Sequence, residues 1–319
     1  GRISFSLKVI DSVRKAVGKD FIVGMRMVAD EDWKLGLSKK EGKQIAKKII
    51  STNKIDFLNI IKGHIDTDPA LTKVIPIQGM ASAPHLDFAG EIKQETNFPI
   101  FHAAKINDIA TARHAISNGK VDMVGMTRAH IAEPYIIKKI LENREDDIRP
   151  CVGATYCLDR IYEGKEALCV HNPATGREKN MPHEITEKTN KTKKIIVVGA
   201  GPAGLEAARI CAERGHQVVV FEAANSAGGQ VNLICRSKKR KDMIGIIDWR
   251  LERCKKNNVK INYNCLATKE NVLSEKPDVI IVATGGIPNT EILEEGSELV
   301  SSSWDVIAGN VNIQDDVIL

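Results

Sequence analysis

The sequence lacks the features that would place the protein in a membrane or outside the cell. Its 319 residues contain no apolar run of about 18 residues, the length that a membrane-spanning helix needs. No basic start followed by an apolar segment opens the chain, so no secretory signal is indicated. The seven cysteines are an odd number, which without a signal predicts reduced thiols in the cytoplasm.

The sequence also lacks a large basic region. The net charge is +5, and the basic residues are scattered or form short clusters such as residues 238–241. A cluster this short indicates a solvated loop, so neither nucleic acid nor a membrane is an expected partner. A hydrophobic content of 43% in 319 residues predicts a soluble globular protein, with two domains.

Both ends of the sequence begin or stop inside regular patterns. Ile3, Leu7, Ile10 and Val13 recur at helical spacing and Gly18 ends the pattern, whereas residues 315–319 predict a strand that is only beginning. We therefore expect the sequence to be part of a longer protein.

Residues 1–148 alternate between strand and helix patterns. Strands are expected at residues 21–27, 57–61, 99–103 and 121–126. Helices are expected at 41–50, 108–117 and 131–141, with Ser38 and either Asn107 or Asp108 as N-caps. This order predicts a parallel sheet with right-handed crossovers. Four such units make either half of an eight-stranded barrel, which needs about 250 residues, or most of an open sheet.

A glycine-rich turn marks the start of a second domain, residues 191–319. A short strand at 195–198 is followed by Gly199, Gly201 and Gly204, then by a helix and a strand that ends at Glu222. This order is the context that a dinucleotide-binding turn requires. Gly199 would allow the tight turn, Gly201 would admit the pyrophosphate, and Gly204 would let helix and strand pack closely. Glu222 could accept hydrogen bonds from ribose hydroxyls.

Two later segments favour FAD over NAD as the bound dinucleotide. Gly228, Gly229 and Gln230 follow Glu222 closely, and residues 279–286 read as a strand that ends in a small-residue turn. The predicted residues of this site are Gly199, Gly201, Pro202, Ala203, Gly204, Glu222, Gly229, Gln230, Ala283, Thr284 and Gly285.

Residues 149–190 break the alternation and form an irregular cysteine module with a linker. Cys151, Cys157 and Cys169 lie close together, as thiolates that bind a soft metal or an iron–sulfur cluster do. A cluster needs four ligands and only three cysteines are present here, so unligated thiols are the alternative.

Residues 149–157 and 169–178, with the glycine turn, resemble the 2,4-dienoyl-CoA reductase and trimethylamine dehydrogenase family, and more finely its N-methylproline demethylase branch. The resemblance implies an old-yellow-enzyme-like TIM barrel with FMN, a [4Fe-4S] cluster and an FAD/NAD(P)-binding Rossmann-like domain. Ala154 stands where the family has its second cysteine. This leaves open a cluster with another ligand, a three-iron form or no cluster.

On this resemblance, residues 1–148 are the second half of the FMN barrel. Arg26, at the end of its strand, would lie beside the flavin pyrimidine. Lys105 and Arg128 would bind the FMN phosphate together with the backbone of Gly125, Met126 and Thr127. His64, Asp66, His85 and His102 lie near strand ends, but no catalytic residue is assigned among them.

The resemblance implies a flavin-dependent oxidoreductase that passes electrons between a small-molecule substrate at FMN, the cluster and the FAD/NAD(P)H domain. An amine dehydrogenase or N-demethylase of the same family is the alternative. From other classes, a simple NAD-dependent dehydrogenase and a non-catalytic nucleotide-binding protein remain. An electron-transfer partner and a homo-oligomer of the full-length protein are expected. The present chain alone is expected to be inactive and poorly soluble, since half a barrel exposes two sheet edges.

Overall fold

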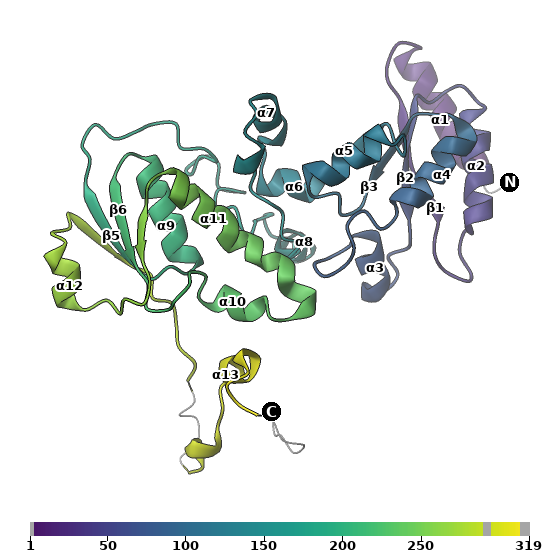
Figure 1. Ribbon diagram of the computed structural model, residues 1–319. Helices are drawn as coiled ribbons and strands as arrows, with labels where there is room; N and C mark the ends of the chain where they lie inside the picture. The colour runs from purple at the N-terminus through teal and green to yellow at the C-terminus, as the bar shows by residue number, and fades with distance from the viewer. Residues whose placement is uncertain (1–2, 290–294, 313–319) are drawn as a thin grey trace. The chain divides into compact units, whose positions relative to one another are not determined.

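The computed structural model describes residues 3–289 and 295–312. The chain forms two compact units, residues 1–134 and 135–319 (Figure 1). The strand predicted at 315–319 lies outside the described residues. The module boundaries predicted at 148 and 190 stay predictions. Within the described part of the chain, every helix is too short or too polar to cross a bilayer.

The first unit is a parallel sheet with helices on one face. Its strands follow the order β1 (Gly24–Asp30), β2 (Phe57–Lys62), β3 (Ile100–Ala103) and β4 (Met123–Gly125), each paired in parallel with the next. One apolar core joins the sheet to the helices α1 (Ser4–Val17), α2 (Lys39–Ile50), α4 (Leu86–Thr96) and α5 (Ile109–Ser117). The shorter helices are α3 (Asp68–Val74) and α6 (Thr127–Ala132).

The two faces of this sheet differ in burial. Ala29, Leu58 and Ile60 belong to the core on the helix side and are fully buried. Side chains of successive strand residues point to opposite faces, so Arg26 and Asn59, which are adjacent in register, lie on the other face. No strand residue on that face is buried. Parallel sheets are normally covered on both sides, and the described residues cover one.

The second unit contains a parallel sheet in the order β7 (Lys260–Asn262), β6 (Gln217–Phe221), β5 (Lys194–Val198) and β8 (Val279–Val282). Helix α9 (Pro202–Glu213) packs on β5 and β6, and α11 (Gly245–Lys256) lies beside α9 (Figure 1). The remaining helical segments of this unit are α7 (Ile136–Leu141), η1 (Glu145–Asp147), α8 (Tyr156–Tyr162), α10 (Gln230–Ile234), η2 (Lys238–Ile244), α12 (Lys269–Ser274), η3 (Ser297–Leu299) and α13 (Ser303–Ala308).

Helix starts were predicted better than strand ends. Ser38 forms a capping box with Glu41, and Asp108, not Asn107, caps α5. The predicted strand 21–27 was wrong by three residues, because Phe21 and Ile22 are exposed and pairing with β2 continues to Asp30. Strand 121–126 shortens to β4.

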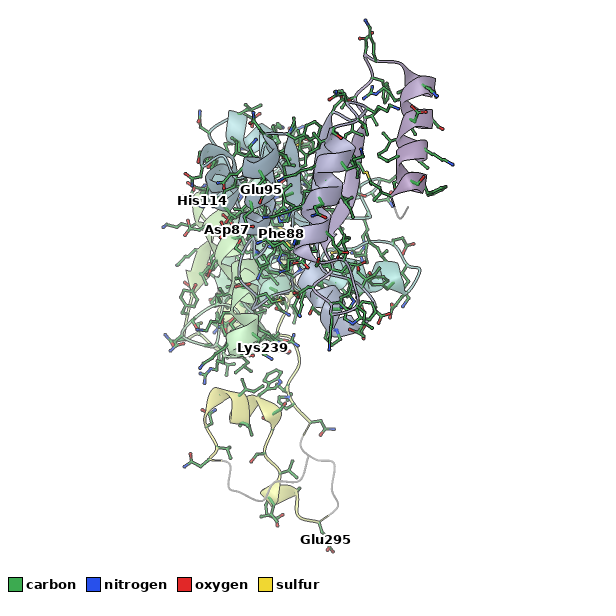
Figure 2. The ribbon with its side chains drawn as sticks, turned by 90° about the vertical axis from the view of Figure 1, so that its right-hand side faces the viewer. Asp87, Phe88, Glu95, His114, Lys239 and Glu295 are labelled. Atoms are coloured by element: carbon green, nitrogen blue, oxygen red, sulfur yellow. The ribbon has the colours of Figure 1, made fainter. Side chains whose placement is uncertain are left out.

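The predicted helix 131–141 was also wrong. Two helices, α6 and α7, lie on either side of Pro134, which has no N–H to donate within a continuous helix. The basic cluster 238–241 lies in η2 and is exposed at Lys239, as a solvated segment should be (Figure 2).

Candidate functional site

The glycine turn of the second unit requires glycine at two positions for steric reasons. Gly199 has φ +102°, and a Cβ there would lie 2.5 Å from the Ala283 carbonyl oxygen. A Cβ at Gly204 would lie 1.9 Å from the Gly199 carbonyl oxygen. A Cβ at Gly201, by contrast, meets nothing within 4 Å. The turn and packing roles predicted for Gly199 and Gly204 are therefore confirmed, and the open space at Gly201 is where a pyrophosphate could approach.

Three segments that are separate in sequence meet at this turn. The Gly228 N–H donates to the Ala200 carbonyl oxygen at 2.9 Å. A Cβ on Gly229 would lie 3.5 Å from the Gly201 Cα, and Gln230 Nε2 donates to the Gly286 carbonyl oxygen at 3.4 Å. The structure thus brings the residues predicted to bind FAD to the carboxyl ends of β5, β6 and β8.

Glu222 holds the backbone of this site. It follows β6, and its Oε2 accepts the Ala200 N–H at 2.7 Å while its Oε1 accepts the Ala224 N–H at 2.8 Å. A carboxylate oxygen has two lone pairs, so each oxygen keeps one for a ribose hydroxyl. Glu222 therefore stabilises the turn through two backbone hydrogen bonds and is also a candidate ligand of the ribose.

The predicted phosphate cations of the first unit both contact one loop. Arg128, on α6, donates from Nη2 to the Pro76 carbonyl oxygen at 2.7 Å, and its buried Nη1 has no partner among the described residues. Lys105 is 9% exposed, and its Nζ donates to the Met80 carbonyl oxygen. A buried guanidinium N–H without a partner is a donor that a phosphate oxygen could take, so these residues fit the phosphate of FMN.

The backbone around these cations is close-packed and strained. A Cβ on Gly125 would lie 2.9 Å from the Ala103 Cβ, so glycine lets β4 approach β3. Ala104 and Lys105 have φ values of +156° and +49°, which cost energy in residues with a side chain. Such strain is typical of binding sites, and here it sets the direction of the Lys105 side chain.

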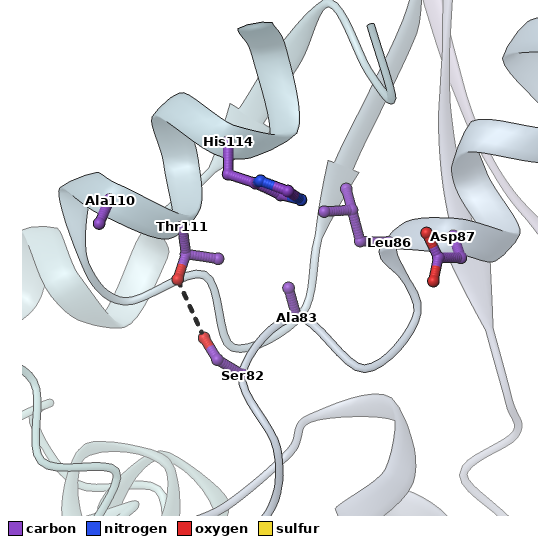
Figure 3. A pocket seen from close by; sticks show the side chains of 7 residues that line it. All are labelled: Ser82, Ala83, Leu86, Asp87, Ala110, Thr111 and His114. Atoms are coloured by element: carbon purple, nitrogen blue, oxygen red, sulfur yellow. Dashed lines mark hydrogen bonds between the residues drawn. The ribbon is translucent and has the colours of Figure 1, made fainter. Parts of the chain in front are cut away.

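A surface pocket of about 420 Å³ lies near the first residues of α4 and α5. Figure 3 shows Ser82 directed toward Thr111 across it, with their hydroxyl oxygens 3.4 Å apart. The pocket is polar and open, and neither Lys105 nor Arg128 lines it. Its lining residues are Ser82, Ala83, Leu86, Asp87, Ala110, Thr111 and His114.

Arg26 does not end its strand, which corrects the prediction. It is the third residue of β1 and is exposed on the face without helices, in one row with Asn59, Phe101 and Met123. The Oδ1 of Asn59 is buried without a partner among the described residues, a second candidate ligand in this row. Sequence reasoning missed Asn59 because it lies inside a strand.

The four polar residues near strand ends have different surroundings. His64, just after β2, lies against Trp33 with ring centroids 5.4 Å apart, and its Nδ1 accepts the Asp66 N–H. His85 Nε2 contacts the Lys73 carbonyl oxygen. His102 is buried, and this burial lowers the pKa of its imidazole. Trp33 follows β1 and His64 follows β2, so this aromatic pair lies beyond the carboxyl ends of two adjacent strands.

The cysteine module belongs to the second unit. Cys151, Cys157 and Cys169 are partly exposed, and the described residues contain no group of three His, Cys, Asp or Glu side chains arranged to hold a metal. Ala154 packs against the apolar core of the unit, next to buried Val152. The donor set therefore does not fit a four-thiolate cluster.

A buried ion-pair network, not predicted from sequence, joins this module to α9 and α11. Glu206 contacts Arg209 at 2.6 Å and Arg250 at 2.8 Å, and Arg250 donates to the His171 carbonyl oxygen at 2.8 Å. Burial raises the pKa of Glu206, but the hydrogen bond and charge of Arg209 and the charge of Arg250 outweigh it, so the pKa lies below its usual value.

Comparison with known proteins defines the class. Residues 1–147 match the NADH:flavin oxidoreductase / NADH oxidase family, and residues 163–315 match the pyridine nucleotide-disulphide oxidoreductase family. The first part of the chain therefore belongs to a family with a TIM barrel, and the second part to a family with a Rossmann-like domain. The family and fold class implied by the resemblance are confirmed.

Particular relatives cover the whole chain. It is 58% identical to a probable N-methylproline demethylase of Rhizobium meliloti (strain 1021) and 44% identical to a multifunctional alkene reductase/demethylase of Caballeronia cordobensis. A 2-naphthoyl-CoA reductase structure superposes on 98% of the chain with a TM-score of 0.89 and 30% identity. The chain spans about half of each, 47%, 46% and 47% of their lengths.

Proposed function

We propose that the protein to which this chain belongs is a flavin-dependent oxidoreductase that oxidatively demethylates a small N-methyl amine. One observation supports the oxidoreductase assignment: each unit has residues that suit a phosphate, the cations Lys105 and Arg128 in the first and the glycine turn in the second. Two nucleotide sites suit electron transfer between a substrate and a dinucleotide. The substrate class rests on the 58% identity to a protein named as a probable demethylase.

The residues of the first unit would bind and orient FMN. Arg128 and Lys105 would take the phosphate, and Arg26 would place a cation where negative charge develops on the reduced ring. FMN bound there would supply a two-electron acceptor for the hydride of the N-methyl C–H bond. The substrate iminium left by this oxidation would take up water and break down to formaldehyde and the demethylated amine. Trp33, half-exposed beside His64, offers an aromatic face to an ammonium substrate.

The residues of the second unit would bind the ADP part of FAD, with NAD(P)H as a further nucleotide. Gly199, Gly201 and the start of α9 would surround the pyrophosphate, and Glu222 would accept from the ribose. An iron–sulfur cluster held by four thiolates is not part of the proposal, because Ala154 leaves three thiols. A cytoplasmic location, a homo-oligomer and an external electron-transfer partner are part of the proposal.

A second function, reduction of an activated alkene by NAD(P)H, is favoured by the relative named as both alkene reductase and demethylase. The two functions run electrons in opposite directions through the same flavin. A non-catalytic nucleotide-binding protein would do neither.

The test uses the full-length protein under anaerobic conditions. It is mixed with N-methylproline, with proline as the matched control, and separately with NADH and cinnamate. We expect N-methylproline, but not proline, to bleach the visible flavin absorbance and to release formaldehyde in an amount equal to the flavin reduced. Consumption of cinnamate without formaldehyde would replace demethylation by alkene reduction, and no flavin absorbance would refute both. Iron and labile sulfide measured on the same preparation decide whether a cluster is present.

A further inference from the structure

One segment of the first unit, residues 76–83, is tied to both phosphate cations. Its Pro76 carbonyl oxygen accepts from Arg128 and its Met80 carbonyl oxygen from Lys105. In return, the Ala83 N–H and the Ser82 hydroxyl each donate to the Lys105 carbonyl oxygen at 3.1 Å. These contacts fix the directions of the Arg128 and Lys105 side chains, so the segment acts as a support for the cation pair.

Gln78 lies between Pro76 and Met80 in this segment, and its side-chain oxygen lacks a hydrogen-bond partner among the described residues. Its Oε1 is buried and has no partner among the described residues, and the same is true of Nη1 of Arg128. Native proteins pair nearly all buried polar side-chain atoms. One residue separates Gln78 from each supported carbonyl in the chain, Ile77 on one side and Gly79 on the other. We therefore infer that its amide faces the proposed phosphate site.

The chemistry of the two orphaned atoms is complementary. The Arg128 Nη1 donates and selects a phosphate oxygen, whereas an amide oxygen only accepts and is repelled by that anion. A partner that suits Gln78 Oε1 at this site is an N–H or O–H group next to the phosphate. In FMN these groups are the hydroxyls of the ribityl chain.

We propose that Gln78 is a further flavin-binding residue, which accepts a hydrogen bond from a ribityl hydroxyl while residues 76–83 hold Lys105 and Arg128 toward the phosphate. The inference rests on the proposed FMN site and extends it to the polyol. It makes the first unit selective for a flavin that carries both a polyol and a phosphate.

The experiment measures binding of three flavins to the apo form of the full-length protein, with ADP present to occupy the dinucleotide site. FMN has the ribityl chain and the phosphate, riboflavin has only the ribityl chain, and lumiflavin has neither. Dissociation constants come from quenching of flavin fluorescence in the parent, Gln78→Leu and Arg128→Ala. Gln94→Leu, which changes an exposed glutamine on α4, is the matched control.

We expect Gln78→Leu to weaken FMN and riboflavin by the same factor, about tenfold for one lost hydrogen bond, and to leave lumiflavin unchanged. Arg128→Ala should weaken FMN alone. Gln94→Leu should bind all three flavins as the parent does. In Gln78→Glu, the carboxylate keeps the hydroxyl acceptor but repels the phosphate, so riboflavin binding should persist while FMN weakens.

Other results overturn the inference in distinguishable ways. If Gln78→Leu binds FMN as tightly as Gln94→Leu does, Gln78 does not contact the flavin. Loss of FMN binding with riboflavin binding retained would assign Gln78 to the phosphate, and equal weakening of lumiflavin would show a general distortion. If Gln78→Leu fails to fold, Gln78→Glu alone decides. A parent protein that binds no flavin refutes the proposed function itself.

Discussion

Each of the two units carries a proposed phosphate site at the end of a parallel sheet, and the two sites differ in how far the described residues complete them. In the second unit, residues 199–230 and 283–286 supply a turn, a brace and a second glycine segment that contact one another. In the first unit, the sheet has a face without helices, and Arg26 lies on it. The segments of the glycine-turn site contact one another. The proposed FMN site, in contrast, has buried polar side-chain atoms without a partner among the described residues.

Buried polar atoms without a partner among the described residues occur in both units, but in the second unit His171 Nε2 lies in the cysteine module and not at the glycine turn. In the first unit, the described residues include four buried side-chain atoms without a partner, Asn59 Oδ1, Gln78 Oε1, His102 Nε2 and Arg128 Nη1. Two of them, on Gln78 and Arg128, adjoin the proposed phosphate site. The comparison teaches that the glycine-turn site is formed by segments that this chain contains, whereas a barrel site draws on eight strands, of which the described residues supply four.

The largest expected effect separates the two units. When residues 1–134 and 135–319 are produced separately, the first should aggregate, since its sheet has an uncovered face and edge strands β1 and β4. The second should stay monodisperse and melt cooperatively. Size-exclusion chromatography and thermal circular dichroism measure both. A first unit that is monomeric with a sharp melt would break the comparison, as would a monodisperse preparation of the whole chain.

The second expected effect is a difference in stability and FAD binding between substitutions at Gly204 and at Gly201 of the same turn. Gly204→Ala should lower the free energy of unfolding of the second unit by about 3 kcal/mol, because its Cβ overlaps the Gly199 carbonyl oxygen. Gly201→Ala should leave stability unchanged, since its Cβ meets open space, but should prevent FAD binding. Chemical denaturation and FAD content are the measurements. Normal FAD content in Gly201→Ala would remove the pyrophosphate from this position.

The smallest effect concerns the buried ion pairs. Glu206 has a lowered pKa in the folded protein, so its charge contributes stability above its unfolded pKa of about 4.5, and this is lost as pH falls through the folded pKa. Glu206→Gln should cost about 2 kcal/mol at neutral pH and flatten the loss of stability in acid. Glu270→Gln, on the surface of α12, is the control. Equal acid sensitivity in parent and Glu206→Gln would contradict this role.

Much of the nucleotide-binding architecture could be predicted from local sequence. The order of strand, glycine turn, helix and Glu222 needs only neighbouring residues, and the structure reproduces it. The caps Ser38 and Asp108 were also predictable, because their hydrogen bonds reach three residues along the chain. Strand ends were harder: β1 continues past residue 27 because β2 pairs with it, a contact more than 30 residues away.

What the sequence by itself determined is most of the strands and helices and the glycine turn, although helices α3 and α4 were not predicted. The proposed phosphate cations Lys105 and Arg128 came from the family resemblance. Only the tertiary structure decided that Gln78 lies in a loop held by both cations, that Arg26 shares a row with Asn59, and that Glu206 is buried between two arginines. These features arise from contacts between segments distant in sequence. The spacing of residues in the sequence predicts which side chains share a face of one strand or helix. Burial, and buried polar atoms without a partner, arise only when distant segments pack together.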